Sequence, residues 1–295
     1  MTDITALRIL TTDHCNYMCQ YCHNEGQITK NAQVMKVDDF KQFLNEIYTP
    51  SIKKIWFSGG EPFSNPDTIK MIEWVHKTYP SCRLGCATNA SLLTDDLIAY
   101  LKKLHVKINI NIPSLRPEIY SKVTGYKNFK LVRNNLEALS RTGVEYALNF
   151  VLDKGTSQEL SEIVKFAISH KCGLKILPYT SPDGKDQIHE LFQGAVAQID
   201  EIGGRKEVDK SGKSVAWYLD VGNQEIRIRT YINPCYNNDF CICKAKGEMR
   251  VLPDFSVKFC LISGKSTPIS WSKGHGKEEV YCAWKNFTKC CDRVI

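Results

Sequence analysis

Three cysteines near the start of the chain have the spacing of a metal site. Cys15, Cys19 and Cys22 form the pattern C-x3-C-x2-C. Three thiolates this close together can hold three irons of a [4Fe-4S] cluster, which leaves the fourth iron open to a small molecule. A zinc site needs a fourth donor, which His14 or His23 can supply. The residues around the cysteines favour the open cluster over zinc.

Two predicted strands lead into the chemistry-bearing residues. The apolar run 7–12 predicts a buried strand that ends just before the cysteines, and the aromatic Tyr21 precedes the last of them. A second run, 54–58, leads into a turn made of Gly59, Gly60, Glu61 and Pro62. Glycines let backbone groups approach a ligand closely. Both motifs therefore lie at strand ends, where a ligand can reach them.

The cysteine loop followed by GGEP resembles the radical S-adenosylmethionine (SAM) superfamily. The resemblance implies that the open iron chelates the amino and carboxylate groups of SAM. It also implies that an electron, from a donor such as flavodoxin or ferredoxin, cleaves SAM to methionine and a 5′-deoxyadenosyl radical. The expected cofactors are SAM and a [4Fe-4S] cluster. In the family the glycine turn meets the SAM ammonium group.

Composition agrees with a soluble cytoplasmic enzyme. The chain has 295 residues, 43% hydrophobic and 24% charged, which suits one large α/β domain with an extension. It shows no signal peptide, transit peptide or membrane-length apolar run. The thirteen cysteines cluster in metal-ligand spacings, which indicates a reducing cytosol. The net charge of +7 fits an anionic substrate or a lysine-rich surface, and its even spread argues against a nucleic-acid partner.

Short apolar runs alternate with amphipathic stretches, as in parallel β/α units. Strands are predicted at 7–12, 54–58, 83–88, 106–112, 145–152 and 174–178. Helices are predicted at 37–48, 66–79, 94–104, 129–142 and 157–170. Six units are too few for a closed eight-stranded barrel, and the resemblance implies a partial (β/α)6 TIM barrel over 1–180. Functional groups then gather at the C-terminal strand ends.

Residues 181–295 are expected to form a C-terminal extension. Residues 203–214 are charged and glycine-containing, which predicts an exposed loop, and 217–220 and 225–231 predict two antiparallel strands. A second cysteine group follows, before and after a predicted hairpin over 248–261: Cys235, Cys241, Cys243 and Cys260. This group suits a structural zinc or a second iron–sulfur cluster.

The remaining cysteines divide into two kinds. Three lie in strand or helix contexts and are predicted to be buried apolar fillers: Cys82, Cys86 and Cys172. The others are predicted to add a ligand to the second group or to stay free thiols: Cys282, Cys290 and Cys291.

The resemblance extends to one branch of the superfamily, typified by the GTP cyclase of molybdopterin biosynthesis. It covers most of 6–178 and about 235–261. In that branch an auxiliary [4Fe-4S] cluster has three cysteine ligands, and its open iron binds the substrate base. Here Cys243, Arg250 and Cys260 fall on family positions, and Lys246 stands where the middle cysteine belongs. Cys235 or Cys241 then replaces that ligand, or both ligate and the cluster is closed.

Other departures argue for a relative with a changed substrate. Phe63, Ser64 and Asn65 follow GGEP in place of the expected basic residue. Glu248 replaces the first of two arginines, which leaves Arg250. The chain ends without the Gly-Gly tail of the cyclase. We therefore expect the radical machinery of the family with a different substrate.

Further candidates follow from family positions at strand ends. Contacts to SAM or substrate are predicted for Thr88, Asn89, Asn111 and Ser114. Asn149 and Lys175 are candidate substrate contacts, and the alternative for Asn109 and Asn111 is a polar barrel interior. Arg227 and Arg229 alternate on one strand and either clamp an anion by bidentate hydrogen bonds or face water.

The leading function is hydrogen abstraction from a small polar, anionic, nucleotide-like or nucleoside-like substrate, with a second [4Fe-4S] cluster. A closed second cluster would instead favour a radical SAM dehydrogenase or a peptide-modifying oxidative enzyme, with that cluster as electron acceptor. The peptide version is disfavoured because the chain starts almost directly at the first strand. A third possibility, from another class, is a non-catalytic iron–sulfur or zinc scaffold.

Overall fold

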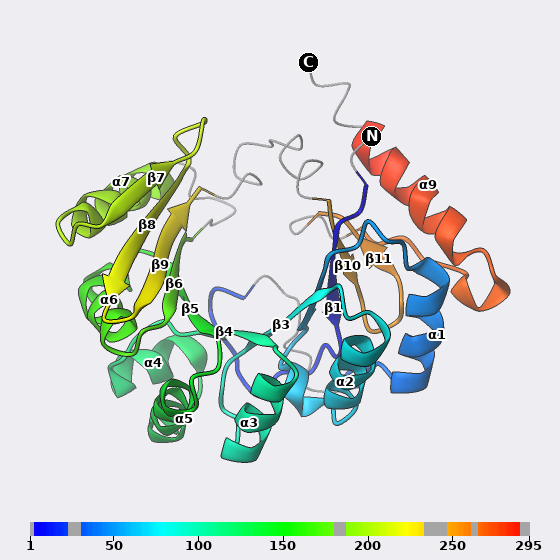
Figure 1. Cartoon of the computed structure of the whole chain (residues 1–295), viewed down its shortest axis with the longest axis horizontal. Coiled ribbons are helices and arrows are strands. Elements are labelled where there is room, and N and C mark those ends of the chain that lie inside the picture. The colour runs from blue at the N-terminus through cyan, green and yellow to red at the C-terminus, as the bar shows by residue number, and fades with distance from the viewer. Residues whose placement is uncertain (1–2, 23–30, 180–186, 233–246, 261–264, 290–295) are drawn as a thin grey trace. The chain divides into compact units, whose positions relative to one another are not determined.

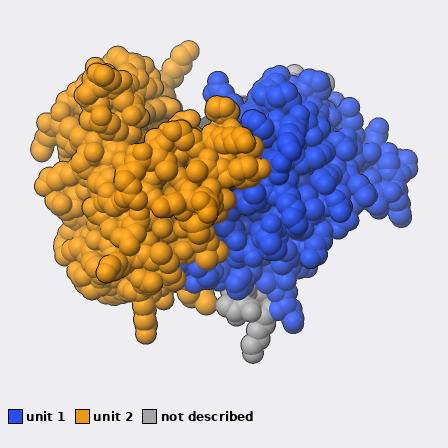
Figure 2. Space-filling view, turned by 60° about the horizontal axis from the view of Figure 1, so that its bottom comes forward, with its two compact units in different colours: residues 1–17, 22–87, 237–295 blue, residues 18–21, 88–236 orange. Residues whose placement is uncertain are grey.

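The computed structural model describes residues 3–22, 31–179, 187–232, 247–260 and 265–289. The chain forms two compact units, shown in Figure 2. Unit 1 contains residues 1–17, 22–87 and 237–295, and unit 2 contains residues 18–21 and 88–236. Each unit is a mainly parallel sheet with helices, so the predicted α/β class is confirmed. Within the described ranges, no helix has both the length and the apolar character needed to cross a bilayer.

The sheet of unit 1 places the first two strands of the chain side by side. β1 (Ala6–Leu10) pairs in parallel with β2 (Lys54–Ser58), and β2 with β3 (Arg83–Thr88). On its other side β1 pairs in parallel with β10 (Glu248–Val251), which forms a hairpin with β11 (Val257–Lys258). The order is therefore β11-β10-β1-β2-β3 (Figure 1). Parallel pairing brings the C-terminal ends of β1 and β2 to one edge, where both motifs begin.

Helices cover one face of the unit 1 sheet. α1 (Val37–Ile47) buries residues at helical spacing, Phe40, Phe43, Leu44 and Ile47, and contacts α9 (Gly276–Lys289) (Figure 1). α2 (Thr68–Thr78) follows a short 3-10 turn, η1 (Pro62–Ser64), and another, η4 (Trp271–Lys273), precedes α9. In β1, Leu7 and Ile9 are fully buried, whereas Arg8 between them is partly exposed. Because side chains alternate along a strand, Arg8 projects from the opposite face of the sheet to Leu7 and Ile9.

The sheet of unit 2 has the order β4-β5-β6-β9-β8-β7. β4 (Lys107–Asn111), β5 (Tyr146–Leu152), β6 (Gly173–Pro178) and β9 (Gln224–Tyr231) pair in parallel. β8 (Ser214–Val221) and β7 (Arg205–Val208) continue the sheet antiparallel. The predicted antiparallel pair over 217–220 and 225–231 is thus confirmed.

The helices of unit 2 connect these strands. In chain order they are α3 (Asp95–Lys103), α4 (Pro117–Thr124), α5 (Phe129–Thr142), the 3-10 turn η2 (Ser157–Glu159), α6 (Leu160–Ser169) and α7 (Gln187–Asp200). Thr94 caps α3 by accepting a hydrogen bond from the backbone N–H of Leu97 at 3.2 Å. α4 and α5 both end at a glycine in the left-handed region, Gly125 and Gly143.

One prediction about the second half of the chain is wrong. Residues 203–214 do not form only a loop, because β7 pairs Arg205–Val208 with β8. All four residues are exposed, so this edge strand lacks the apolar alternation by which a strand is recognised. The prediction that three cysteines are buried is confirmed for Cys82, Cys86 and Cys172. Burial raises the pKa of the Cys172 thiol to about 12, which makes it inert as a nucleophile or ligand.

The strands after residue 180 extend the sheets of both units. β7, β8 and β9 lie in unit 2, and β10 and β11 lie in unit 1. The compact units therefore do not divide the chain at residue 180. The division into a radical SAM partial barrel over 1–180 and a C-terminal extension over 181–295 stays a prediction.

Candidate functional site

The GGEP turn is hydrogen-bonded directly to the backbone that carries the first cysteine. The N–H of Gly60 donates to the carbonyl of Thr12 at 2.8 Å, and the N–H of Glu61 donates to the carbonyl of His14 at 2.8 Å. His14 immediately precedes Cys15. Two motifs that lie far apart in the sequence thus form one structure at the ends of β1 and β2.

Only glycine fits the first two positions of this turn. A Cβ added at Gly60 would lie 1.9 Å from the carbonyl oxygen of His14 and 2.8 Å from the backbone nitrogen of Cys15. A Cβ at Gly59, whose φ is +131°, would lie 2.3 Å from the carbonyl oxygen of Thr12. The contacts are to backbone, which cannot rotate away. The glycines are therefore required for the close approach of the turn to the cysteine loop.

The rest of the turn is fixed by its own side chains. Glu61 is fully buried, and its Oε1 accepts a hydrogen bond from the backbone N–H of Phe63 at 3.2 Å. Asn65 is also buried and donates through Nδ2 to the carbonyls of Thr11 and Met35, each at 2.9 Å. Asn65 stands near the place where the family has a basic residue, and here it links the turn to β1. Asn65 therefore has a structural role in this protein.

The cysteine loop presents partly exposed thiols. Cys15, Cys19 and Cys22 are all half-buried, and the backbone N–H of Tyr17 donates to the Sγ of Cys15 at 3.4 Å. N–H···S hydrogen bonds of this kind tune the potential of iron–sulfur clusters. Three thiols on a loop that packs against the glycine turn fit an iron–sulfur cluster.

Several of the predicted metal ligands lie outside the residues that the structure describes. Over the ranges that the structure describes, no group of three or more His, Cys, Asp and Glu side chains is arranged to hold a metal ion. Cys235, Cys241 and Cys243 lie outside those ranges, as do Cys290 and Cys291. Cys260, half-buried, lies two residues beyond β11, and Cys282 is exposed on α9. Assignment of the metal ligands therefore rests on spacing and family.

The turn after β3 holds Thr88 and Asn89, both predicted contacts. Both are buried, and the Thr88 Oγ1 accepts from the N–H of Ala90 at 3.0 Å. The Asn89 Oδ1 accepts from the N–H of Ser91 at 2.9 Å and from its hydroxyl at 2.7 Å. Ala90 has a φ of +64°, a conformation that a non-glycine residue keeps only when its neighbours hold it. The two predicted residues build this turn through their side-chain oxygens.

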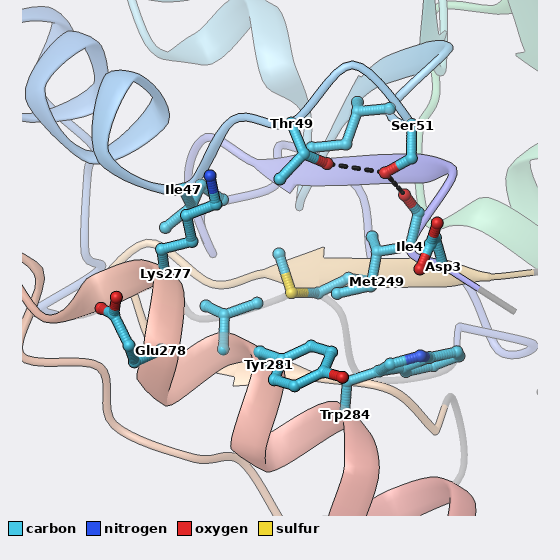
Figure 3. A pocket seen from close by; sticks show the side chains of 12 residues that line it. Asp3, Ile4, Ile47, Thr49, Ser51, Met249, Lys277, Glu278, Tyr281 and Trp284 are labelled. Atoms are coloured by element: carbon cyan, nitrogen blue, oxygen red, sulfur yellow. Dashed lines mark hydrogen bonds between the residues drawn. The ribbon is translucent and has the colours of Figure 1, made fainter. Parts of the chain in front are cut away.

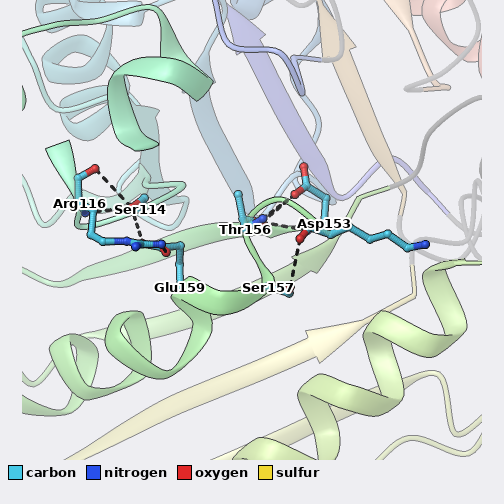
Figure 4. Close-up of polar contacts among 7 residues, drawn as sticks. Ser114, Arg116, Asp153, Thr156, Ser157 and Glu159 are labelled. Atoms are coloured by element: carbon cyan, nitrogen blue, oxygen red, sulfur yellow. Dashed lines mark hydrogen bonds and ion pairs between the residues drawn. The ribbon is translucent and has the colours of Figure 1, made fainter. Parts of the chain in front are cut away.

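Ser114, beyond the end of β4, is bound to a buried carboxylate (Figure 4). Its hydroxyl donates to the Oε2 of Glu159 at 2.5 Å, and the guanidinium of Arg116 pairs with the Oε1 of the same residue. Burial alone would raise the pKa of Glu159, but the hydrogen bonds from Arg116 and Ser114 outweigh it and hold that pKa low. Because the Ser114 hydroxyl already donates its hydrogen bond to Glu159, it can only accept a hydrogen bond from a ligand.

Four predicted residues form one row across the unit 2 sheet. Asn111 of β4 is the register partner of Asn149 of β5, Asn149 is the partner of Lys175 of β6, and Lys175 is the partner of Arg229 of β9. Register partners on neighbouring strands project from the same face of a sheet. The sequence placed these residues on four separate strands, and the structure brings them together. We call them the polar row.

The polar row is linked internally. The Nδ2 of Asn149 donates to the Oδ1 of Asn111 at 3.1 Å, and the Nζ of Lys175 donates to the Oδ1 of Asn109 at 2.8 Å. The register partner of Asn109 on β5 is Ala147, so the contact between Lys175 and Asn109 joins β6 to β4 across β5. Within the described chain the Oδ1 of Asn149 is buried without a hydrogen-bond partner. A buried acceptor without a donor is costly, so a donor from a ligand would stabilise this oxygen.

Arg229 is the cation at the end of the row. Burial lowers the pKa of its guanidinium, although it stays charged. Of the described residues, those that influence its pKa are Tyr231, Arg227 and Tyr218, and none is a carboxylate. The guanidinium of Arg229 lies 5.3 Å from the centroid of the Tyr231 ring. Arg227 is exposed and lies over the ring of Tyr218, 5.5 Å from its centroid. The two arginines differ in exposure: Arg227 is exposed, whereas Arg229 is half-buried and no carboxylate of the described residues acts on it.

Arg250 belongs to a different group, in unit 1. Its Nη2 lies 3.1 Å from the Oε1 of Glu248, and the Nε of Arg8 lies 3.2 Å from the same oxygen. Arg8 and Arg250 are register partners, and Trp56 of β2 is the next partner along. The Trp56 ring lies on Gly85, where an added Cβ would meet it at 2.1 Å. Glu248 therefore offsets the charge that the predicted Arg250 would otherwise present.

Sequence reasoning missed Arg8 and Trp56. Each is the central, half-buried residue of a five-residue strand and lies between two buried apolar residues, so alternation turns it away from the face that buries them. That signal was available. The sequence did not show that Arg8 and Trp56 lie beside Arg250, because this depends on the parallel pairing of β1 with β10, two strands far apart in the chain.

A separate pocket of about 370 Å³ lies in unit 1 (Figure 3). Its walls come from the chain before β1, the α1–β2 connection, Met249 and α9, with Ile47, Tyr281 and Trp284 among its apolar lining. It contains none of the cysteines or GGEP residues. The pocket is therefore distinct from the predicted SAM site.

Comparison with known proteins identifies the family. A family model described as the radical SAM superfamily matches residues 9–167, more than half of the chain. The chain belongs to the radical SAM superfamily, and it is an enzyme of the radical SAM kind with SAM and a [4Fe-4S] cluster as cofactors. The resemblance seen in the sequence is confirmed.

Individual relatives agree with that assignment. A protein of Methanococcus aeolicus named "Probable GTP 3′,8-cyclase" is 27% identical over 299 residues, covering 99% of this chain and 95% of its own. One of the same name from Methanothermobacter marburgensis is 26% identical over 267 residues, covering 88% and 85%. These names are consistent with the cyclase-like branch predicted from the sequence.

Solved structures share the fold. Streptococcus suis SuiB bound to S-adenosylmethionine superposes with a TM-score of 0.69 at 14% identity, covering 92% of this chain. The protein anSMEcpe with bound AdoMet gives 0.62 at 16% identity, covering 88% of this chain and 75% of that one. This chain spans 64% of SuiB, somewhat under two thirds of its length. These matches confirm the parallel α/β architecture of radical SAM partial barrels.

Proposed function

We propose that this enzyme abstracts hydrogen from a small, anionic, nucleotide-like substrate that binds at the polar row. The radical that initiates this chemistry comes from SAM and the cluster when both are bound. The observation that carries the proposal is the half-buried Arg229, in register with Lys175 and without a carboxylate acting on it in the described chain. A cation kept from water without a counter-charge is costly, and an anionic ligand removes that cost.

Binding and orientation are the tasks of the protein in this proposal. Lys175 and Arg229 bind the anionic group, and the orphaned acceptor of Asn149 receives a donor from the substrate. The turn of Gly59, Gly60 and Glu61 binds SAM beside the cysteine loop, as the family implies. Thr88, Asn89, Asn111 and Ser114 stay proposed SAM contacts on the family resemblance alone, and Pro62 shapes the turn that begins η1.

The charge pattern separates this substrate from that of the GTP cyclases. Several relatives carry that name, which supports a nucleotide-like class. In this chain, however, Glu248 shares its carboxylate between Arg8 and Arg250. The face of β10 and β1 is therefore less positive than two unpaired arginines would make it. We propose that the anionic part of the substrate binds at the polar row in unit 2, and Arg250 stays a predicted substrate contact whose charge Glu248 offsets.

The placement of the substrate can be tested by measuring how tightly inorganic tripolyphosphate and GTP bind. Lys175→Gln and Arg229→Gln should each weaken binding of both probes about tenfold or more, because each removes one charge-assisted hydrogen bond of about 1.5–3 kcal/mol. The matched control is Lys165→Gln, which removes an exposed lysine paired with Glu162 on α6. Dissociation constants from calorimetry on the anaerobic protein give the comparison. Equal affinities in all three variants would rule out the polar row as the anion site.

A second [4Fe-4S] cluster is the other part of the proposal. In this view residues 1–180 form the SAM core and 181–295 the extension that holds the second cluster. Cys260, just beyond the β10–β11 hairpin, is one proposed ligand, and the others are Cys243 with Cys235, Cys241 or both. The sequence relatives named as cyclases support it, since the chain matches them through this region.

Metal analysis distinguishes one cluster from two. The anaerobically purified enzyme should contain about eight irons and eight sulfides per chain, since each cubane holds four of each. Replacing Cys243 and Cys260 by serine should lower both values to about four and leave SAM cleavage intact. About four irons with one zinc in the unmodified protein would instead identify a structural zinc site.

The enzyme also needs an electron source. We propose a small redox protein such as a flavodoxin or ferredoxin, acting in the cytoplasm. The peptide-modifying alternative has a structural neighbour, because SuiB has also been solved bound to the precursor peptide SuiA. At 14% identity that match supports the fold alone. Binding at the polar row therefore remains the basis for the small-molecule proposal.

A further inference from the structure

The segment around Cys19 is attached to the C-terminal end of α4. The backbone N–H of Met18 donates to the carbonyl of Thr124 at 2.9 Å, and the N–H of Gln20 donates to the carbonyl of Val123 at 3.1 Å. The side chain of Gln20 adds a third contact, from Nε2 to the carbonyl of Lys122 at 3.3 Å. The residues on both sides of Cys19 are thus tied to the last turn of one helix.

These contacts satisfy groups that a helix end leaves open. The last carbonyls of an α-helix have no partner within the helix and need donors from elsewhere. In α4 three consecutive carbonyls, those of Lys122, Val123 and Thr124, receive donors from Met18 and Gln20. The donors of the cysteine loop therefore satisfy carbonyls at the end of α4.

The end of α4 is shaped for this role by Gly125 and Thr124. Gly125 is in the left-handed region, with φ of +73°, and its N–H donates to the carbonyl of Ser121 at 2.9 Å. A Cβ at Gly125 would lie 3.4 Å from the Cβ of Met18, at the limit of ordinary contact. Thr124 is buried, and its hydroxyl donates to the carbonyl of Tyr120 at 2.7 Å. The turn is closed by two hydrogen bonds, and the cysteine loop contacts it at Met18.

We propose that the C-terminal turn of α4, closed by Gly125, is a positioning element that holds Cys19 as a cluster ligand. A cluster loop needs its thiols fixed before metal arrives, because ordering a loose loop opposes binding. The glycine turn of β2 fixes the backbone next to Cys15, and α4 fixes the backbone on both sides of Cys19. This inference rests on the assignment of Cys15, Cys19 and Cys22 to the cluster.

A matched pair of glycine variants tests the proposal. Gly125→Val places a branched side chain against Met18, and Gly143→Val places the same residue at the end of α5. Both glycines have a left-handed φ, +73° and +66°, so both variants pay the same kind of backbone strain. At Gly143 a Cβ would meet only the Nζ of Lys102, 3.8 Å away, at the flexible end of its side chain. The pair therefore differs in contact with the cysteine loop.

The readout is the rate of iron release to a chelator from the anaerobically reconstituted enzyme. We expect Gly125→Val to lose iron about tenfold faster than Gly143→Val, a difference equivalent to about 1.4 kcal/mol. The low-temperature EPR signal of the reduced cluster should shift in response to SAM in Gly143→Val and shift less in Gly125→Val. Thermal unfolding of both variants gives the size of the shared strain.

Each outcome has a defined meaning. Equal iron release from the two valine variants would overturn the role of α4. If Gly125→Val does not fold, Gly125→Ala and Gly143→Ala replace the pair, since alanine adds the φ strain with a smaller intrusion on Met18. If the unmodified protein binds no four-iron cluster, the cluster assignment fails instead, which is a separate result.

Discussion

Replacing Cys15, Cys19 and Cys22 together by alanine is expected to abolish formation of 5′-deoxyadenosine. The three thiols are the ligands implied by the spacing and by membership of the radical SAM superfamily. Without them the protein cannot hold the cluster that supplies the electron to SAM. Reduced, anaerobic protein is incubated with excess SAM, and the nucleoside is quantified by chromatography. Loss should reach the background of the protein-free reaction.

The control for this variant is Cys82→Ala. Cys82 is buried and donates to the carbonyl of Ile52 at 3.4 Å, so its loss affects packing and leaves the cysteine loop intact. The variant should keep its cluster and most of its activity. Nucleoside formation that persists in the triple variant at the level of this control would show that another set of ligands supports cleavage.

The second large effect is expected for Gly60→Val. Its Cβ would lie 1.9 Å from the carbonyl oxygen of His14, so the GGEP turn and the cysteine loop cannot keep their contact. Two backbone hydrogen bonds, from Gly60 and Glu61, are lost with it, at about 0.5–1.5 kcal/mol each beyond the steric cost. We expect SAM affinity to fall by at least about tenfold and iron content to fall as well.

Gly194→Val is the control for this substitution. Gly194 lies in α7, and a Cβ there would have no heavy atom within 4 Å. Equilibrium dialysis with labelled SAM and iron analysis should show no change in this variant. Wild-type SAM affinity in Gly60→Val would mean that the turn does not form the SAM site.

Much of the fold could be predicted because apolar periodicity dominates the barrel units. The strands over 54–58 and 83–88 and the helix over 129–142 have the predicted bounds. The short helix α4 was missed, since only Tyr120 and Thr124 of its eight residues are buried. α7 and α9 were also missed; each contains a glycine, Gly194 or Gly276, which is a poor helix former.

The candidate site was predictable residue by residue but not as a set. Asn111, Asn149, Lys175 and Arg229 were each selected by strand position, yet their common row follows from the registers of β4, β5, β6 and β9. The insertion of β9 beside β6 was not visible, because the two strands are separated by α7 and a hairpin. Pairing by Glu248 was equally hidden, since it needs the side-chain contacts of Arg8 and Arg250.

The central claim is that this chain generates a 5′-deoxyadenosyl radical at a cluster held by Cys15, Cys19 and Cys22. The most direct test is reductive cleavage of SAM by the unmodified, anaerobically reconstituted enzyme, with methionine and 5′-deoxyadenosine quantified together. The account predicts equal amounts of the two products, formed only when reductant and cluster are both present. A protein with a full complement of iron and sulfide that binds SAM, yet yields neither product under strong reduction, would contradict it.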